Sequence, residues 1–138
     1  MSETAIDWSQ LGAPSLKDIE SLAETALAAL PAEFRDLCQD IIIRIEDFPD
    51  DETLDAMGCE TEFDLLGLFT GQGLAQGGPR SLTGQMPNLI FLYRRPLLDY
   101  WAEHEDTLGA LVTHVLVHEI GHHFGLSDAD MARIENEE

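Results

Sequence analysis

The segment from Thr107 to Phe124 constrains the fold more than any other stretch of this chain. Its apolar residues recur at intervals of three and four, which places them on one face of an α-helix; they are Leu108, Leu111, Val112, Val115 and Leu116. Asp106 or Thr107 can cap the N-terminus, and Gly125 suits a chain that leaves the last turn in a left-handed conformation. A helix with so wide an apolar face is expected to lie against the body of the protein.

Three other segments have the composition of β-strands. Each is rich in β-branched or other apolar residues, and they cover residues 41–48, 64–71 and 88–95. The acidic stretch 46–55 and the glycine-rich stretch 70–88 are predicted to be loops, because they lack a sustained apolar period.

Helical patterns fill much of the remainder. They are a helix over 15–30 that starts with the capping-box-like pair Ser15 and Asp18, a short turn within 31–40, a helix from Pro96 and a last helix from Ser127. Strands followed by helices predict an α+β fold. We expect a small, partly antiparallel sheet of about three strands packed on helices, with the helix 107–124 near the C-terminus.

The charge of the chain excludes some partners. Seven basic and 27 acidic residues give a net charge of −20, which repels nucleic acids and anionic membrane surfaces. The length predicts one domain over 1–138, with flexible ends at 1–14 and 134–138. The first ten residues lack the basic start and apolar run of a secretory signal. A cytoplasmic protein with reduced Cys38 and Cys59 is therefore expected.

The C-terminal half of the helix 107–124 carries a candidate metal site. His118 and His122 lie one turn apart, a spacing of roughly 5–6 Å between Cβ atoms, so both imidazoles can reach one ion. Gly125 breaks the helix, and Asp128 follows closely enough to return as a third ligand. Zn²⁺ commonly takes three such protein ligands and one water, and Ni²⁺ or Co²⁺ can use the same donors. Glu119 would flank the ion and accept a proton from that water.

Several neighbouring residues have two interpretations. Ser127 and Asp130 resemble a cap for the last helix, and Asp128 would then be a first-turn acid favoured by the helix dipole. His114, one turn before His118, is either a hydrogen-bonded core histidine or a residue that orients the metal ligands. His123 projects about 100° away from His122 and is expected to support the site or to lie at the surface.

The pattern H-E-x-x-H-x-x-G-x-x-D, filled by His118, Glu119, His122, Gly125 and Asp128, resembles the zincin signature with aspartate as third ligand. The flanking sequences NLIFLYRRPLLDYW and LVTHVLVHEIGHHFGLSDADM are similar to those of the small bacterial zincin-like metallopeptidases with a minimal metalloprotease fold. This resemblance implies a metal-binding α+β domain with an edge strand beside the helix.

The strand 88–95 is the candidate for that edge, on which an extended peptide would pair. Tyr93, Arg94 and Arg95 at its end are then candidate substrate-binding residues. The alternatives are an ordinary strand with Ile90 and Leu92 in the core, and arginines that pair with acidic side chains.

Two functions follow from this site. The first is a zinc-dependent metallopeptidase that hydrolyses short or flexible peptides, with Glu119 as the general base. The second is a non-catalytic metal-binding module that binds a peptide or protein segment in an open groove. Only sixteen residues follow His122, whereas metzincins place a lower subdomain there. The floor of the cleft is therefore expected either to be missing or to be supplied by a partner or a second copy of the chain.

Overall fold

The three predicted strands form one mixed sheet. The computed structural model describes residues 5–71 and 88–136. Its strands are β1 (Ile41–Glu46), β2 (Gly67–Thr70) and β3 (Asn88–Tyr93), in the spatial order β1-β3-β2. β1 runs parallel to β3, and β2 runs antiparallel to it. The prediction of an α+β fold with a small, partly antiparallel sheet is confirmed.

The place of β3 in this sheet differs from the expectation of an edge strand. β3 pairs on both sides, so its backbone has no free edge along the strand. Ile90 and Leu92 are completely buried, as the alternative interpretation required. The expectation failed because strand order depends on how distant segments pair, which the local pattern of β3 does not encode. Within residues 5–71 and 88–136, the edge strands are β1 and β2.

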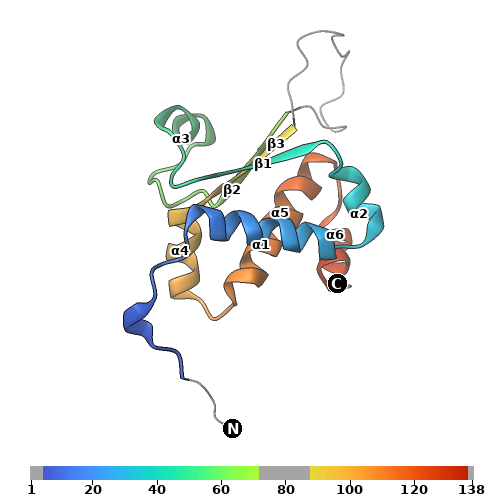
Figure 1. Ribbon diagram of the computed structural model, residues 1–138. Coiled ribbons are helices and arrows are strands. Elements are labelled where there is room, and N and C mark those ends of the chain that lie inside the picture. Colours follow the sequence, from blue (N-terminus) through green and yellow to red (C-terminus); the bar gives the residue numbers. More distant parts are fainter. Residues whose placement is uncertain (1–4, 72–87, 137–138) are drawn as a thin grey trace.

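Six α-helices and one 3₁₀-helix accompany the sheet in the described residues. They are η1 (Trp8–Gln10), α1 (Leu16–Ala29), α2 (Ala32–Leu37), α3 (Asp51–Met57), α4 (Arg94–Glu103), α5 (Leu108–His123) and α6 (Asp128–Asn136). Figure 1 shows α1 and α5 on the same side of the sheet, with α2 and α6 at one end of this helical layer and α4 at the other.

Capping fixes where the two central helices begin. Ser15 and Asp18 form the predicted capping box of α1, in which each side chain accepts a hydrogen bond from the other residue's backbone amide. Thr107 caps α5, since its hydroxyl accepts a hydrogen bond of 3.1 Å from the amide of Ala110. Both contacts satisfy amides that the helix itself leaves without a partner.

The core lies between α5, α1 and the sheet. Half of the residues of α5 are buried, and α1 contributes Ile19 and Ala23. A close approach between α5 and β2 depends on Gly67, because a Cβ atom there would lie 2.8 Å from Cγ1 of Val115. The absence of a side chain at Gly67 thus lets the middle of α5 lie directly on β2.

Three element boundaries differ from the predictions. The acidic stretch 46–55 is not only a loop, because α3 starts within it, where Asp50 accepts a 2.8 Å hydrogen bond from the Thr53 amide. α4 starts at Arg94, directly after β3 and before Pro96. The predicted flexible C-terminal end began at residue 134, but α6 continues to Asn136 and Ile134 is 3% exposed. Most of the predicted glycine-rich loop, residues 72–87, lies outside the described residues.

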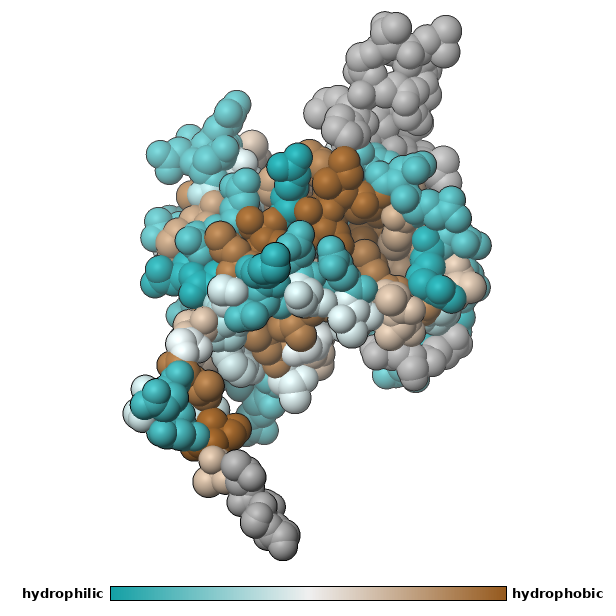
Figure 2. Space-filling view, viewed as in Figure 1, coloured by the Kyte–Doolittle hydropathy of each residue, from teal (hydrophilic) through white to brown (hydrophobic). Residues whose placement is uncertain are grey.

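The surface is mostly hydrophilic at its periphery. Figure 2 shows hydrophobic residues in the centre of this face and along the N-terminal segment at the lower left. In that segment Ile6, Trp8 and Leu11 are each more than half exposed. Within residues 5–71 and 88–136, none of the helices has the length and apolar composition needed to cross a membrane.

Candidate metal centre

Three histidines follow one another along α5. His114, His118 and His122 recur every four residues, and this spacing places them on one side of the helix. The ring centroids of His114 and His118 are 4.0 Å apart, and those of His118 and His122 are 5.7 Å apart. The side chain of His118 is 28% exposed, whereas those of His114 and His122 are 54% and 59% exposed. Solvent therefore reaches all three imidazoles.

The turn after α5 brings the chain back toward these histidines. Gly125 has a φ of 83°, the left-handed conformation predicted for it. The amide of Leu126 donates a 2.9 Å hydrogen bond to the carbonyl of Gly121, which closes the turn. Ser127 and Asp130 then make reciprocal contacts of 3.0 and 3.4 Å at the start of α6. The predicted cap of the last helix is confirmed.

Asp128 lies in the first turn of α6 and faces His122. Its Oδ1 atom is 3.4 Å from Nε2 of His122, and its side chain is 90% exposed. The interpretation of Asp128 as a first-turn acid is confirmed, and its role as a metal ligand stays a prediction. In addition to its place in the first turn, its carboxylate lies 3.4 Å from the ring of His122.

α6 packs unusually close to α5. A Cβ atom built on Gly121 would lie 2.5 Å from Sδ of Met131 and 2.9 Å from its Cγ. Met131 is fully buried and Ile134 is 3% exposed, so the inner face of α6 is held against the core. Glu135 follows Met131 by four residues and lies on the same side of α6. The packing thus directs Glu135 toward α5.

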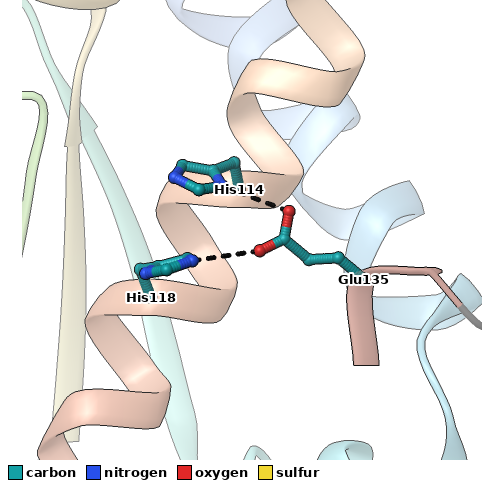
Figure 3. A group of neighbouring side chains, drawn as sticks. All are labelled: His114, His118 and Glu135. Carbon is teal, nitrogen blue, oxygen red and sulfur yellow. Dashed lines mark hydrogen bonds and ion pairs between the residues drawn. The ribbon is translucent and has the colours of Figure 1, made fainter. Parts of the chain in front are cut away.

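Glu135 contacts two of the three histidines, and sequence analysis did not single it out. Its Oε1 atom is 3.1 Å from Nδ1 of His114, and its Oε2 atom is 3.1 Å from Nε2 of His118. Figure 3 shows the carboxylate of Glu135 between the two rings. The expected core position of His114 is wrong, because its side chain is more than half exposed, although it is hydrogen-bonded. The four-residue spacing between Met131 and Glu135 was the sequence signal that could have placed Glu135 on the inner face of the last helix.

His114, His118 and His122 are called the histidine row below. Glu119 lies near His122, at the end of this row, and next to β2. It is partly buried, and burial raises the pKa of its carboxyl group. The nearby His122 and a hydrogen bond from the backbone amide of Phe69 act in the opposite direction and favour the carboxylate. The side chain of Glu119, the candidate base, therefore extends from α5 to the neighbouring strand β2.

His123 lies about 100° around α5 from His122, and its side chain packs against β2. Its ring stacks on Phe69 with centroids 3.9 Å apart, and burial lowers its pKa. Its Nε2 atom is buried and has no hydrogen-bond partner among the described residues. An imidazole in this position supports β2 through ring contact and lies away from the donors of His118 and His122.

The predicted substrate-binding arginines make structural contacts. Arg94 forms a 2.9 Å ion pair with Asp47, and its Nε atom donates a hydrogen bond to the carbonyl of Pro14. The guanidinium of Arg95 lies 5.4 Å from the ring centre of Phe48. These contacts agree with the alternative interpretation of Arg94 as a partner of an acidic side chain.

Tyr93 also lies apart from the histidine row. It is 3% exposed, and burial, with the charges of Glu46 and Asp50, raises its pKa to about 12. In the sheet, Tyr93 lies at the end of β3 remote from Ile90, the residue opposite Phe69. The contacts described above for Arg94 and Arg95 are with Asp47, Pro14 and Phe48, and none of these contacts involves His118, His122 or Glu119.

The sequence profile of a family described as zincin-like metallopeptidase matches residues 38–138, which is most of the chain. The chain belongs to the zincin-like metallopeptidase family. The matched region includes the whole histidine row, Glu119, Asp128 and Glu135.

A solved structure shows that the fold is shared. A conserved hypothetical protein from Thermus thermophilus has a TM-score of 0.52 and 24% sequence identity. The similarity covers 79% of this chain and 92% of that protein. No curated protein matches the sequence.

A zincin-like family implies a divalent metal, usually zinc, and the donors of this chain fit such an ion. Imidazole nitrogens and carboxylate oxygens are ordinary zinc ligands. Of the predicted ligands, His122 and Asp128 lie 3.4 Å apart, whereas His118 contacts Glu135, which was not predicted. One donor atom from each of His114, His118 and Glu135 lies within 4.8 Å of the other two. Both halves of the histidine row therefore offer donors of the right chemistry.

Proposed function

We propose that this protein is a zinc-dependent peptidase that hydrolyses short or flexible peptides. The observation that carries the proposal is the position of Glu119, a partly buried carboxylate beside two histidines one helical turn apart and in contact with an edge strand. His118, His122 and Asp128 would hold the ion. When bound, such an ion activates water and polarises the carbonyl group that is attacked.

Glu119 would act as general base and then as general acid. Its carboxylate takes a proton from the attacking water and returns it to the nitrogen of the leaving amine, so no net proton is consumed at this residue. Burial raises its pKa, which makes the carboxylate a stronger base than an exposed one. The backbone amide of Phe69 fixes its orientation through a hydrogen bond.

Among the described residues, no strand pairs with the outer edge of β2, which an extended peptide could therefore use. The amide of Tyr93 donates to the carbonyl of Leu66 at 3.0 Å, which sets the alternation along this antiparallel pair. By that alternation, Gly67 and Phe69 direct their backbone groups away from β3. The amide of Phe69 is used by Glu119, and its carbonyl and the backbone of Gly67 point to the same edge. A peptide paired with β2 would lie beside Glu119.

One contact supports the alternative function, a metal-binding module without catalysis. Glu135 lies 3.1 Å from Nε2 of His118, the atom that would join His122 in holding the ion. If Glu135 retained this contact, His118 would stay away from His122 and Asp128, and no ion would be held by these three residues beside Glu119.

Metal analysis and cleavage, measured together, test the proposal. Wild type, Glu119→Gln and the control Glu105→Gln, an exposed glutamate outside the site, are purified without chelators and incubated with a mixed library of unstructured peptides. We expect about one zinc ion in each protein, with cleavage by wild type and Glu105→Gln and none by Glu119→Gln. Zinc in wild type without cleavage would favour the module, and absence of zinc would refute the metal site.

A further inference from the structure

We propose that His114, His118 and Glu135 form a second zinc site, which shares His118 with the site of the proposed function. The donors are Nδ1 of His114, Nε2 of His118 and the carboxylate of Glu135. This inference concerns zinc binding by the chain and holds whether or not the protein cleaves peptides.

The donor atoms are already gathered. They lie within 4.8 Å of one another, and each histidine nitrogen is 3.1 Å from a carboxylate oxygen. Tetrahedral zinc with bonds of about 2.0–2.2 Å places its ligand atoms roughly 3.3 Å apart. Small side-chain rotations thus suffice to admit an ion.

The scaffold that presents these donors is rigid. His114 and His118 stand one turn apart on the most buried helix of the protein. Glu135 is flanked by the buried Ile134, and Met131 fixes α6 against Gly121. On the other side of α6, Arg133 forms a 2.9 Å ion pair with Glu33 of α2. Ligands on packed elements lose little conformational entropy when an ion binds.

Charge also favours a cation at this place. The chain carries a net charge of −20, so a divalent cation is attracted to the protein as a whole. The side chain of Glu135 is 22% exposed, and its ion-pair partners among the described residues are His114 and His118, which are charged only when protonated. An ion bound to both imidazoles would neutralise this carboxylate permanently.

The shared residue makes the two sites exclusive. Nε2 of His118 can bind one ion at a time, and in this structure it faces Glu135. Zinc held by His114, His118 and Glu135 therefore withdraws His118 from His122 and Asp128. Under the proposed function, molecules that hold zinc in the second site are inactive, and their share is set by the ratio of the two affinities and not by the zinc concentration.

Zinc titration of full-length variants tests the inference without any substrate. His122→Ala/Asp128→Ala removes the donors specific to the first site, and His118→Ala removes the shared donor. Calorimetry with zinc, in competition with a chelator, gives the affinities, and Co²⁺ absorption reports the ligand set. We expect His122→Ala/Asp128→Ala to bind one zinc ion, and the addition of Glu135→Gln or His114→Ala to weaken that binding by at least ~10-fold, the lower end of what support residues contribute. His118→Ala should lose both sites.

Two results would overturn the inference. One is a His122→Ala/Asp128→Ala protein that folds but binds no zinc. The other is zinc binding by that protein that Glu135→Gln and His114→Ala leave unchanged, in which case the contact is an ion pair only. If these variants fail to fold, NMR of the single variant His122→Ala under zinc titration decides the matter, because zinc in the second site must shift the Nδ1 signal of His114 and an unchanged signal refutes the site. Loss of peptide cleavage alone affects only the proposed function.

Discussion

The carboxylate of Glu119 on α5 accepts a hydrogen bond from the backbone amide of Phe69 on β2. This contact joins the candidate general base to the strand edge on which a peptide would pair. The ring of Phe69 also stacks on His123, the neighbour of His122. The base and the peptide edge are thus held in one local arrangement, and a displacement of β2 would move both.

The partly buried Glu119 should cost stability at neutral pH. Its pKa is raised, so the folded protein holds this proton more tightly than the unfolded chain does. The stability it contributes is present at low pH and is lost as pH rises from the ordinary value of 4.5 through the raised pKa. We expect metal-free Glu119→Gln to be more stable than wild type at pH 7.5, with a smaller difference at pH 4.

Urea unfolding of metal-free proteins at both pH values measures this effect. Glu105→Gln is the matched control, because Glu105 is an exposed glutamate and a surface substitution of this kind changes stability by no more than about 0.5 kcal/mol. Equal stabilities of wild type and Glu119→Gln at pH 7.5 would contradict the burial of this carboxyl group.

Two glycines of α5 should respond in opposite ways to alanine. Gly121→Ala places a Cβ atom against the buried Met131, whereas a Cβ atom at Gly109 meets nothing within 4 Å. Overpacking costs about 1–3 kcal/mol and alanine regains about 1 kcal/mol of helix propensity, so Gly121→Ala should lose up to about 2 kcal/mol. Gly109→Ala should be neutral or gain up to about 1 kcal/mol. Thermal unfolding measures both.

A double mutant shows whether Met131 is the cause. Met131→Ala removes the side chain that the new Cβ atom would meet, at a cost of its own of about 2–5 kcal/mol. In that background Gly121→Ala should cost much less than in wild type, which gives a coupling energy between the two residues. Independent, additive effects would argue against the close approach of α5 and α6.

Arg94→Ala should lower stability and leave catalysis intact. Its guanidinium joins Asp47 and the carbonyl of Pro14, and loss of these partly buried contacts should cost about 1–2 kcal/mol. Arg95→Ala is the control, because its contact with Phe48 is exposed and worth about 0.5–1 kcal/mol. A fall in kcat/KM on peptides, with stability unchanged, would instead support the substrate role predicted from sequence.

Cys38 should resist alkylation in the folded protein. Burial raises its pKa from 9.0 to about 12, and its thiol donates a 3.4 Å hydrogen bond to the carbonyl of Phe34. Because only the thiolate reacts, a shift of this size lowers the reactive fraction by roughly 1000-fold. With iodoacetamide at pH 8, Cys38 should react at least ~100-fold more slowly when folded than in denaturant. Cys59 is the internal reference, followed by mass spectrometry.

Local sequence signals predicted the helices and the turn near the site well. The capping pair Ser15 and Asp18, the cap at Thr107 and the left-handed Gly125 all act over a few residues, and each is present in the structure. Strand order was not predictable in the same way, because β3 becomes the central strand only through pairing with segments far from it.

In the candidate site, too, contacts set by nearby residues were predictable from the sequence, and contacts set by the packing of distant segments were not. The spacing of His118 and His122 follows from helical geometry, and the turn at Gly125 returns Asp128 to His122. The contact of Glu135 with His114 and His118 depends on how closely α6 approaches α5. That approach depends on the absence of a side chain at Gly121, a packing effect that a motif does not reveal.

The turn at Gly125 also bears on the order in which the protein assembles. Every histidine and carboxylate of both proposed zinc sites lies on α5 and α6, two helices joined by a short connection. Contacts between such neighbours form quickly, since little chain entropy is lost in closing the loop. The pairing of Ile41 with Asn88 requires a far longer loop to close. We therefore expect the helical hairpin to be an early folding unit, one that zinc can stabilise before the sheet is complete.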